Sequence, residues 1–296
     1  MLRCLSDAHP LRHAPRCQRA RRGRRHPADR SCPQGTPRRV SPRLLRAATV
    51  VLLLATSVIA ACDGATPKGD TEDVVMQIPF AAGERLVYAI QNGAGVRLGT
   101  GTLTVAAEGD HLSLRQMYTE ASPPVGKPAS TDGASVEVNA KTLRPLAGTR
   151  SIARRQGDEA PLDAYTWTYG AAGGKEALRS TAVKHDERPS LKDITLRDPY
   201  YDNETSLWLW RTLAFAKGYD KFYVSANAVE QEQQTVNLSI RQRETVQVPA
   251  GTFEAWRLLF RNGRAVRTAW VNVNTPHEVV KWDNGEVIFL LESSSR

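Results

Sequence analysis

The residues with the most definite chemistry end a short apolar run near position 60. Residues 47–61 are almost wholly apolar, follow two arginines and close with Ile59-Ala60-Ala61 before Cys62. A basic flank, a short apolar segment and small residues form a secretory signal, and the run is too short to cross a bilayer comfortably as a helix. This ending looks like a bacterial lipobox, in which the cysteine thiol receives a diacylglyceryl group and becomes the first residue after cleavage. The sequence therefore predicts Cys62 as a lipidation site; a buried helix that ends at a cysteine is the alternative.

Lipid on Cys62 would decide where the protein resides. One acyl chain holds a protein to a membrane only marginally, whereas two or more hold it stably, because each buried methylene adds ~0.8 kcal/mol. We therefore expect an exported protein that is anchored to a membrane through the lipid on Cys62. Its folded part would lie in the periplasm or at the cell surface.

The segment before the apolar run is unusually long for a signal. Residues 1–42 contain eleven arginines, no lysine and few apolar residues, whereas a whole signal usually spans about 15–30 residues. Residues 1–61 therefore read as a signal peptide with an N-terminal extension. One hypothesis is that the start codon is mis-assigned and that translation begins at Val40, and the choice between Met1 and Val40 stays open.

Removal of residues 1–61 reverses the charge of the chain. They hold 13 of the 40 basic residues and 2 of the 31 acidic residues of the chain. The rest of the chain therefore has 27 basic and 29 acidic residues, and its formal charge is −2 instead of +9. The basic excess of the whole chain therefore lies in the removed segment, and no nucleic-acid partner is expected for the rest. Only Cys62 of the four cysteines remains, so neither a disulfide within one chain nor a cysteine metal site is expected.

The part after Cys62 carries no familiar catalytic motif. His111, His185 and His277 lie in three different segments, and only His185 has carboxylates beside it, in Lys184-His-Asp-Glu-Arg188. This run is most simply a charged surface loop, and a metal or acid–base role is the alternative. Gly-x-Ser-x-Gly, His-Glu-x-x-His and phosphate-binding glycine loops are missing. We expect no enzymatic activity and no cofactor.

A second polar cluster consists of Asp198, Asp202, Asn203 and Glu204. Its oxygen atoms suit Ca²⁺, but the spacing of an EF-hand is not found. The better interpretation is a helix cap by Asp202 or Asn203, with Glu204 in the first turn, where negative charge is favourable to the helix dipole. The residues that follow predict one short helix before Gly218 that packs against a sheet.

The six tryptophans all lie between Trp167 and Trp282. They can fill the core of a domain without disulfides, or they can line a pocket for an acyl chain or an apolar peptide. Trp208 and Trp210 are the candidate ligand-binding residues. Two positions apart on a short helix, they point in different directions, so we expect that one sheet cannot bury both.

The remainder of the chain predicts strands separated by turns. Residues 62–76 are rich in small and polar residues and predict a flexible tether. Over residues 77–296, β-prone runs alternate with turn residues about every ten positions, which is typical of a meandering antiparallel sheet in a single domain. The expected strands are 85–91, 96–107, 111–118, 135–139, 143–152, 165–169, 177–184, 193–196, 236–240, 243–248, 253–260, 265–273, 278–282 and 287–291. The fold class is therefore all-β with one short helix.

Distinctive residues stand at the two ends of this domain. They are Pro79-Phe80, Gly83-Glu84, Leu86, Tyr88, Gly99 and Gly101 near the start, and residues 248–255, Trp270-Val271, Pro276 and residues 279–281 near the end. In these residues the chain resembles exported bacterial β-proteins of the domain of unknown function 3108 family. The resemblance implies a long, strongly curved antiparallel sheet, a spiral β-roll or open half-barrel, similar in shape to periplasmic lipoprotein carriers. No catalytic residue belongs to this pattern.

Three functions of different classes follow. The leading hypothesis is a membrane-anchored, non-catalytic β domain that binds a lipid, a lipoprotein segment or another envelope component. The second is a purely structural envelope lipoprotein, and the third is a hydrolase with an unrecognised site. An apolar groove beside Trp208 would favour a carrier. A fully packed sheet would favour a structural protein, and a deep polar cleft around His185 would favour an enzyme.

Overall fold

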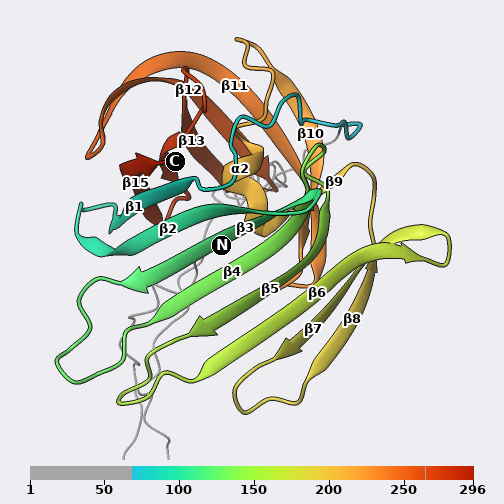
Figure 1. The fold of residues 1–296 in the computed structure, drawn as a ribbon, viewed down its shortest axis with the longest axis vertical. Coiled ribbons are helices and arrows are strands. Elements are labelled where there is room, and N and C mark those ends of the chain that lie inside the picture. Colours follow the sequence, from blue (N-terminus) through green and yellow to red (C-terminus); the bar gives the residue numbers. More distant parts are fainter. Residues whose placement is uncertain (1–68, 264) are drawn as a thin grey trace, which may run out of the picture. The chain divides into compact units, whose positions relative to one another are not determined.

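The computed structural model describes residues 69–263 and 265–296, which belong to one compact unit. The predicted signal peptide, the lipobox and Cys62 lie outside these residues. Fifteen strands of the described part form a single curled sheet, which is antiparallel except for the pair at one end (Figure 1). The prediction of an all-β fold with one long curved sheet and one short helix is confirmed.

The strands of the first half follow one another in the sheet as they do in the sequence. They are β1 (Arg85–Asn92), β2 (Arg97–Glu108), β3 (His111–Glu120), β4 (Thr131–Asn139), β5 (Pro145–Ala153), β6 (Leu162–Ala172), β7 (Lys175–Val183) and β8 (Ser190–Thr195). Each pairs with the next in an antiparallel ladder, and β8 forms one edge of the sheet. All eight strands expected in this half are therefore present.

The strands of the second half continue the sheet from the other side of β1. They are β9 (Tyr200–Asp202), β10 (Asp220–Asn227), β11 (Glu232–Val248), β12 (Gly251–Asn262), β13 (Ala265–Asn272), β14 (Val279–Asp283) and β15 (Val287–Ser295). β15 pairs with β1, so the first and last strands are neighbours. β9 forms the other edge and runs parallel to β10. The C-terminal meander is confirmed.

Three features of the second half differ from the expectation, and the first is the three-residue edge strand β9, which was not predicted. The sequence did not predict β10, in which Tyr223 to Ala226 are all buried, because a strand covered on both faces shows no alternation of polar and apolar residues. The expected strands 236–240 and 243–248 form one strand, β11, whose register against β12 shifts between Ile240 and Gln242. A bulge of this kind interrupts the alternation without ending the strand.

A short helix lies inside the curl of the sheet (Figure 1). It consists of the 3₁₀ turn η2 (Asn203–Thr205) and the helix α2 (Ser206–Leu209). Asp202 is the N-cap, and its Oδ1 accepts a hydrogen bond from the backbone N–H of Glu204 at 2.7 Å. This bond satisfies a donor that has no partner within the helix, so the predicted cap is confirmed.

Both tryptophans of the helix region are buried. Trp208 is 1 % and Trp210 is 5 % exposed. Trp210 stacks on Phe260 of β12 with 4.1 Å between ring centroids, and it meets Trp282 of β14 edge-on at 5.7 Å. The expectation that one sheet cannot bury both side chains is wrong, because a curled sheet covers a short helix from several directions.

The two edges of the sheet come together without pairing. Only residues 196–199 connect β8 to β9, and within the described residues no backbone ladder joins these two strands. Side chains instead join β8 to β11 and the turn before it: Gln233 donates to the carbonyl of Thr195 at 2.6 Å, and Lys192 donates to the carbonyl of Gln231 at 2.8 Å. The sheet is therefore an open half-barrel.

The described residues before β1 lie against the domain. Thr71 forms a parallel bridge with Phe222 of β10, and Val74 is 3 % exposed. Burial of this apolar side chain stabilises the packed position of the segment. The flexible tether predicted for residues 62–76 is therefore too long at its C-terminal end, because the chain is already packed at Thr71.

Candidate functional site

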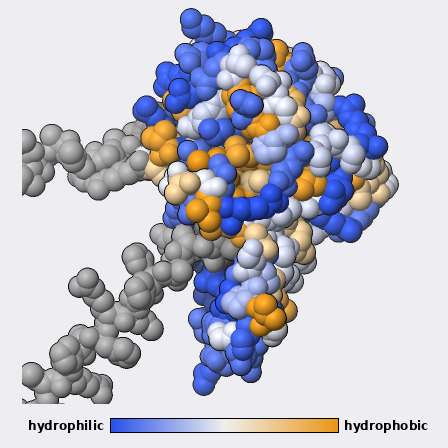
Figure 2. All heavy atoms as spheres, turned by 90° about the vertical axis from the view of Figure 1, so that its left-hand side faces the viewer, coloured by the Kyte–Doolittle hydropathy of each residue, from blue (hydrophilic) through white to orange (hydrophobic). Residues whose placement is uncertain are grey.

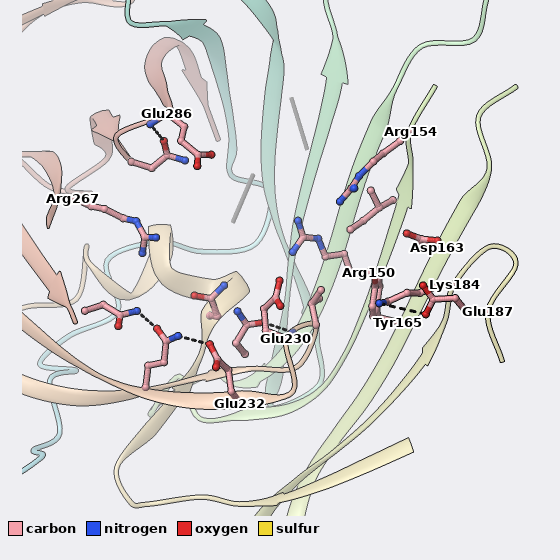
Figure 3. Close-up of a pocket in the computed structure, with 17 residues that line it drawn as sticks. Arg150, Arg154, Asp163, Tyr165, Lys184, Glu187, Glu230, Glu232, Arg267 and Glu286 are labelled. Atoms are coloured by element: carbon pink, nitrogen blue, oxygen red, sulfur yellow. Dashed lines mark hydrogen bonds and ion pairs between the residues drawn. The ribbon is translucent and has the colours of Figure 1, made fainter. Parts of the chain in front are cut away.

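A polar cavity of about 600 Å³ opens inside the curl, next to the start of the helix. Strands β5 and β6 and the loop after β7 line one side, and strands β10 to β13 and the turn between β14 and β15 line the other. Figure 3 shows Arg150, Arg154 and Asp163 on one side of this space and Arg267 and Glu286 on the opposite side. Segments far apart in the sequence thus contribute to one site.

The lining residues continue the inward-facing rows of their strands. Side chains alternate between the two faces of a strand. In β5, Arg150 therefore shares the face of buried Ile152, and Arg154 follows directly after the strand. In β13, Arg267 shares the face of buried Ala269. The inner face of the sheet is thus apolar where it meets the helix and polar where the cavity lies.

The lining side chains are mostly polar and carry both signs of charge. The basic ones are Arg150, Arg154, Lys184 and Arg267, the acidic ones are Asp163, Glu187, Glu230, Glu232 and Glu286, and the amides are Asn203, Asn227, Gln234, Asn262 and Asn284. Ile152, Tyr165 and Val229 add a small apolar area. The cavity therefore offers many hydrogen-bond donors and acceptors, and its five acidic side chains outnumber its basic side chains by one.

A buried network forms the base of the cavity around Arg150. The guanidinium donates to both oxygens of Asp132, at 2.8 and 2.6 Å, and to Oε1 of Glu204 at 3.0 Å. Oε2 of Glu204 accepts from the side-chain amide of Gln116 at 2.6 Å. All four side chains are buried. Because a buried charge is costly unless it is paired and hydrogen-bonded, these contacts hold Arg150 firmly in place.

The carboxylate of Asp202 is a second buried acid beside this network. It accepts hydrogen bonds from Nε1 of Trp167 and the hydroxyl of Tyr169, both at 2.8 Å, and from the backbone N–H of Glu204. Burial, together with the negative charge of Glu204, raises the pKa of Asp202 to about 7, although the three donors act in the opposite direction. Asp202 is therefore a structural acid that titrates near neutral pH.

A row of hydrogen-bonded side chains forms the far wall of the cavity. The amide of Asn262 donates to Gln234, whose own amide donates to Glu232 (Figure 3). Arg267 lies on the same side and makes no salt bridge within the part of the chain that the structure describes. Its guanidinium is a donor group directed into the cavity.

The two tryptophans predicted to bind a ligand are core residues. Nε1 of Trp208 has no hydrogen-bond partner among the described residues. Trp210 borders a hollow of only about 50 Å³ that adjoins the cavity and shares Asn203, Asn262 and Arg267 with it. That volume is far below the roughly 300–1,000 Å³ of typical small-molecule sites. Binding of an apolar ligand by Trp208 and Trp210 stays a prediction.

The histidines have separate surroundings. His185 is exposed and lies 3.2 Å from the carboxylate of its neighbour Asp186, so the run from Lys184 to Arg188 is the charged surface loop that the sequence predicts. His277 contacts the ring of Phe215. Within residues 69–263 and 265–296, no three or more His, Cys, Asp or Glu side chains are grouped to hold a metal ion.

Two inward-facing arginines are the signal in the sequence that could have predicted the cavity. Arg150 and Arg267 interrupt otherwise apolar inward rows, next to Ile152 and Ala269. A charge at such a position predicts either a buried ion pair or a hollow. Which of the two is present depends on the strands across the curl.

None of the helices in the described part of the chain has the length and apolar character needed to span a membrane.

Comparison with known proteins identifies one family and several similar folds. The model of a family described as "Protein of unknown function (DUF3108)" matches residues 86–288. A β-barrel-like protein of domain of unknown function DUF1849 from Brucella abortus has a TM-score of 0.48 at 8 % identity, over 75 % of this chain and 98 % of that one.

Two further structures have lower TM-scores. A protein from Parabacteroides distasonis that is provisionally described as a lipoprotein has a TM-score of 0.30 at 8 % identity, over 76 % of this chain and all of the other. A protein from Bacteroides fragilis with a YmcC-like fold, provisionally described as exported, has 0.28 at 10 % identity, again over 76 % of this chain and all of the other. No curated relative matches the chain.

Proposed function

Because the chain belongs to the DUF3108 family, whose description assigns no activity, we propose a function from its own residues. In this proposal the protein is a membrane-anchored lipoprotein of the cell envelope. Its β domain binds a polar envelope component and does not catalyse a reaction on it. The cavity inside the curl carries this proposal. Its volume of about 600 Å³ falls within the roughly 300–1,000 Å³ of ligand sites.

The anchor part of the proposal rests on the lipobox and on chain length. Eight residues lie between Cys62 and Thr71, where the packed part of the chain is already in place. Even a fully extended chain of this length spans only about 30 Å. A lipid on Cys62 would therefore hold the β domain close to the membrane surface.

The ligand is polar because the apolar part of the inner face is already filled. The helix and its aromatic neighbours Trp210, Phe260 and Trp282 occupy it. On the outside, Figure 2 shows one side of the molecule as mainly hydrophilic, with hydrophobic residues in small separate groups. An acyl chain needs a continuous apolar surface, so the polar cavity is the better site for a ligand.

The groups that line the cavity support binding rather than catalysis. The described residues that line it include no serine, threonine, cysteine or histidine. Lys184 lies 3.6 Å from the carboxylate of Glu187, and Asp163 accepts from the backbone N–H of His185 at 2.9 Å. A serine, threonine or cysteine nucleophile beside a histidine base is therefore not formed by these side chains.

The anchor is tested by metabolic labelling with an alkyne analogue of palmitate. The full chain, expressed in a Gram-negative host, should take up the label and sediment with membranes. Cys62→Ser should be unlabelled. Equal labelling of both proteins, or label in neither, would contradict the anchor.

The binding function is tested by native mass spectrometry of the detergent-extracted full chain from the same cells. A co-purifying polar molecule in stoichiometric amount would support the proposal. A mass equal to that of the lipidated protein alone, together with no binding to any added envelope extract, would instead favour a structural protein.

A further inference from the structure

We infer that the cavity binds a saccharide, the hydroxyl-rich part of an envelope glycan. This inference rests on the proposed binding function and names the chemical class of its ligand. It is argued from the charge balance of the lining, from the hydrogen-bonding capacity that remains open, and from the placement of these groups on both sides of the cavity.

The charge balance of the lining argues against a polyanion. Four bases face five acids, and Arg150 is already held by Asp132 and Glu204. Lys184 lies close to Glu187. A phosphate or another polyanion requires an excess of positive donors, which this cavity does not have. A neutral ligand suits it better.

The amides at the rim have one end fixed by the backbone and the other end open. Oδ1 of Asn284 accepts from the N–H groups of Glu286 and Val287, both at 2.8 Å. Oδ1 of Asn227 accepts from the N–H of Glu230 at 3.1 Å. Because the backbone donors identify the oxygen, each NH₂ group must point away from the backbone as a donor. Two donors of known orientation thus border the cavity.

Acceptors and one cationic donor complete the set. Asn262 uses its amide nitrogen on Gln234, so its oxygen is open. The carboxylates of Glu230 and Glu286 form no salt bridge or hydrogen bond within the described chain. Arg267 lies across the cavity from Arg150 (Figure 3). The oxygen of Asn262 and the two carboxylates can accept hydrogen bonds from an uncharged ligand, and Arg267 can donate hydrogen bonds to it.

Sugar hydroxyls fit this arrangement because each can donate and accept at once. Neighbouring hydroxyls on a ring can bridge a fixed donor and a fixed acceptor, which is what the amides, Arg267 and Glu230 provide. Val229 and Ile152 add an apolar area against which the C–H groups of a ring can pack. A peptide could also pair its charged termini with Arg267 and Glu230, so a tetrapeptide is one of the probes in the test.

The test uses the full chain in detergent on a microarray of bacterial glycans of defined structure, followed by calorimetry with the best binder. Three comparison probes are titrated in parallel: a tetrapeptide with free termini, inorganic phosphate, and phosphatidylglycerol vesicles. The variants are Arg267→Gln and Glu230→Gln. The matched control is Arg261→Gln, an exposed arginine of the adjoining strand β12 that does not line the cavity.

The expected result is a glycan that binds the native chain and loses about tenfold or more in affinity in Arg267→Gln, because a charge-assisted hydrogen bond is lost. Glu230→Gln should weaken the same glycan, and Arg261→Gln should not. The midpoint of thermal unfolding is measured for every variant. If Arg267→Gln unfolds, Glu230→Gln decides the outcome.

Each other result overturns the inference in a recognisable way. Glycan binding that neither cavity variant changes would place the site elsewhere. Binding of the peptide, phosphate or vesicles alone, weakened in Arg267→Gln, would refute the saccharide and leave the proposed binding function standing. Binding of no probe at all would refute both.

Discussion

The guanidinium of Arg211 holds the carboxylate of Glu84 at two points in the interior of the domain. Nη1 lies 2.6 Å from Oε1 and Nη2 lies 2.8 Å from Oε2, and both side chains are at most 2 % exposed. Nε and Nη2 of Arg211 also donate to the carbonyl of Pro276, at 3.2 and 3.0 Å. One side chain thereby joins the segment after α2, the start of β1 and the turn before β14.

The first prediction concerns this ion pair. Glu84→Gln should lower the free energy of unfolding by about 3–5 kcal/mol, because it leaves the buried guanidinium without a counter-charge. Urea denaturation measures the change. The exposed pair of Arg97 and Glu292 is the control, and Arg97→Gln should cost less than about 1 kcal/mol.

A double variant separates the ion pair from general damage to the core. Glu84→Leu together with Arg211→Met should cost clearly less than the sum of the two single changes, because no unpaired charge remains. Additive costs would contradict the interpretation that the charge itself must be neutralised.

The second prediction is a pH dependence that arises from Asp202. Its pKa is raised from 3.8 to about 7 in the folded state, so between these values the folded chain binds the proton more strongly than the unfolded chain. This contribution to stability is complete at pH values below about 4, declines as the pH rises through 7, and is lost above that.

The measurement compares the native chain with Asp202→Asn at pH 5 and pH 8. The stability of the native chain relative to the variant should fall by about 2–3 kcal/mol between these pH values, since one pKa unit corresponds to about 1.4 kcal/mol. All other titrating groups are common to both proteins. A difference that does not change with pH would show that Asp202 is ionised throughout.

The third prediction concerns the close packing of β5 on β6. A Cβ atom at Gly148 would overlap the ring of Trp167, whereas one at Gly170 would meet nothing within 4 Å. Gly148→Ala should therefore destabilise the domain by about 1–3 kcal/mol, because it displaces the ring from Asp202. Gly170→Ala is the control, and its effect should stay within about 1 kcal/mol of zero. Equal melting temperatures for both variants would contradict the packing described.

The fourth prediction decides the role of Trp208. Because it is 1 % exposed, Trp208→Ala should lower the free energy of unfolding by about 3–5 kcal/mol. Binding of an apolar fluorescent probe, measured below the unfolding midpoint, should not change. Weaker probe binding with an unchanged melting temperature would instead restore Trp208 as a ligand-binding residue.

The amino-acid sequence alone determined the local features of this protein. Turn residues such as Asn92, Asn262 and Gly263 separate the strands, and Asp202 caps the helix as expected. These features depend on a few neighbouring residues and on fixed dihedral preferences, so they can be read without the fold. The lipobox at Cys62 is a local pattern of the same kind, and it lies outside the described residues.

Only the tertiary structure decided what lies inside the curl. The alternation of β5 and β13 places Arg150 and Arg267 on inner faces, but it does not say whether these faces meet helix, solvent or each other. The curl of the sheet depends on the pairing of β15 with β1 and on side-chain contacts between β8 and β11, such as that of Gln233 with Thr195. Because curvature sums small twists over many strands, it decides that Trp208 is buried and that a polar cavity remains beside it.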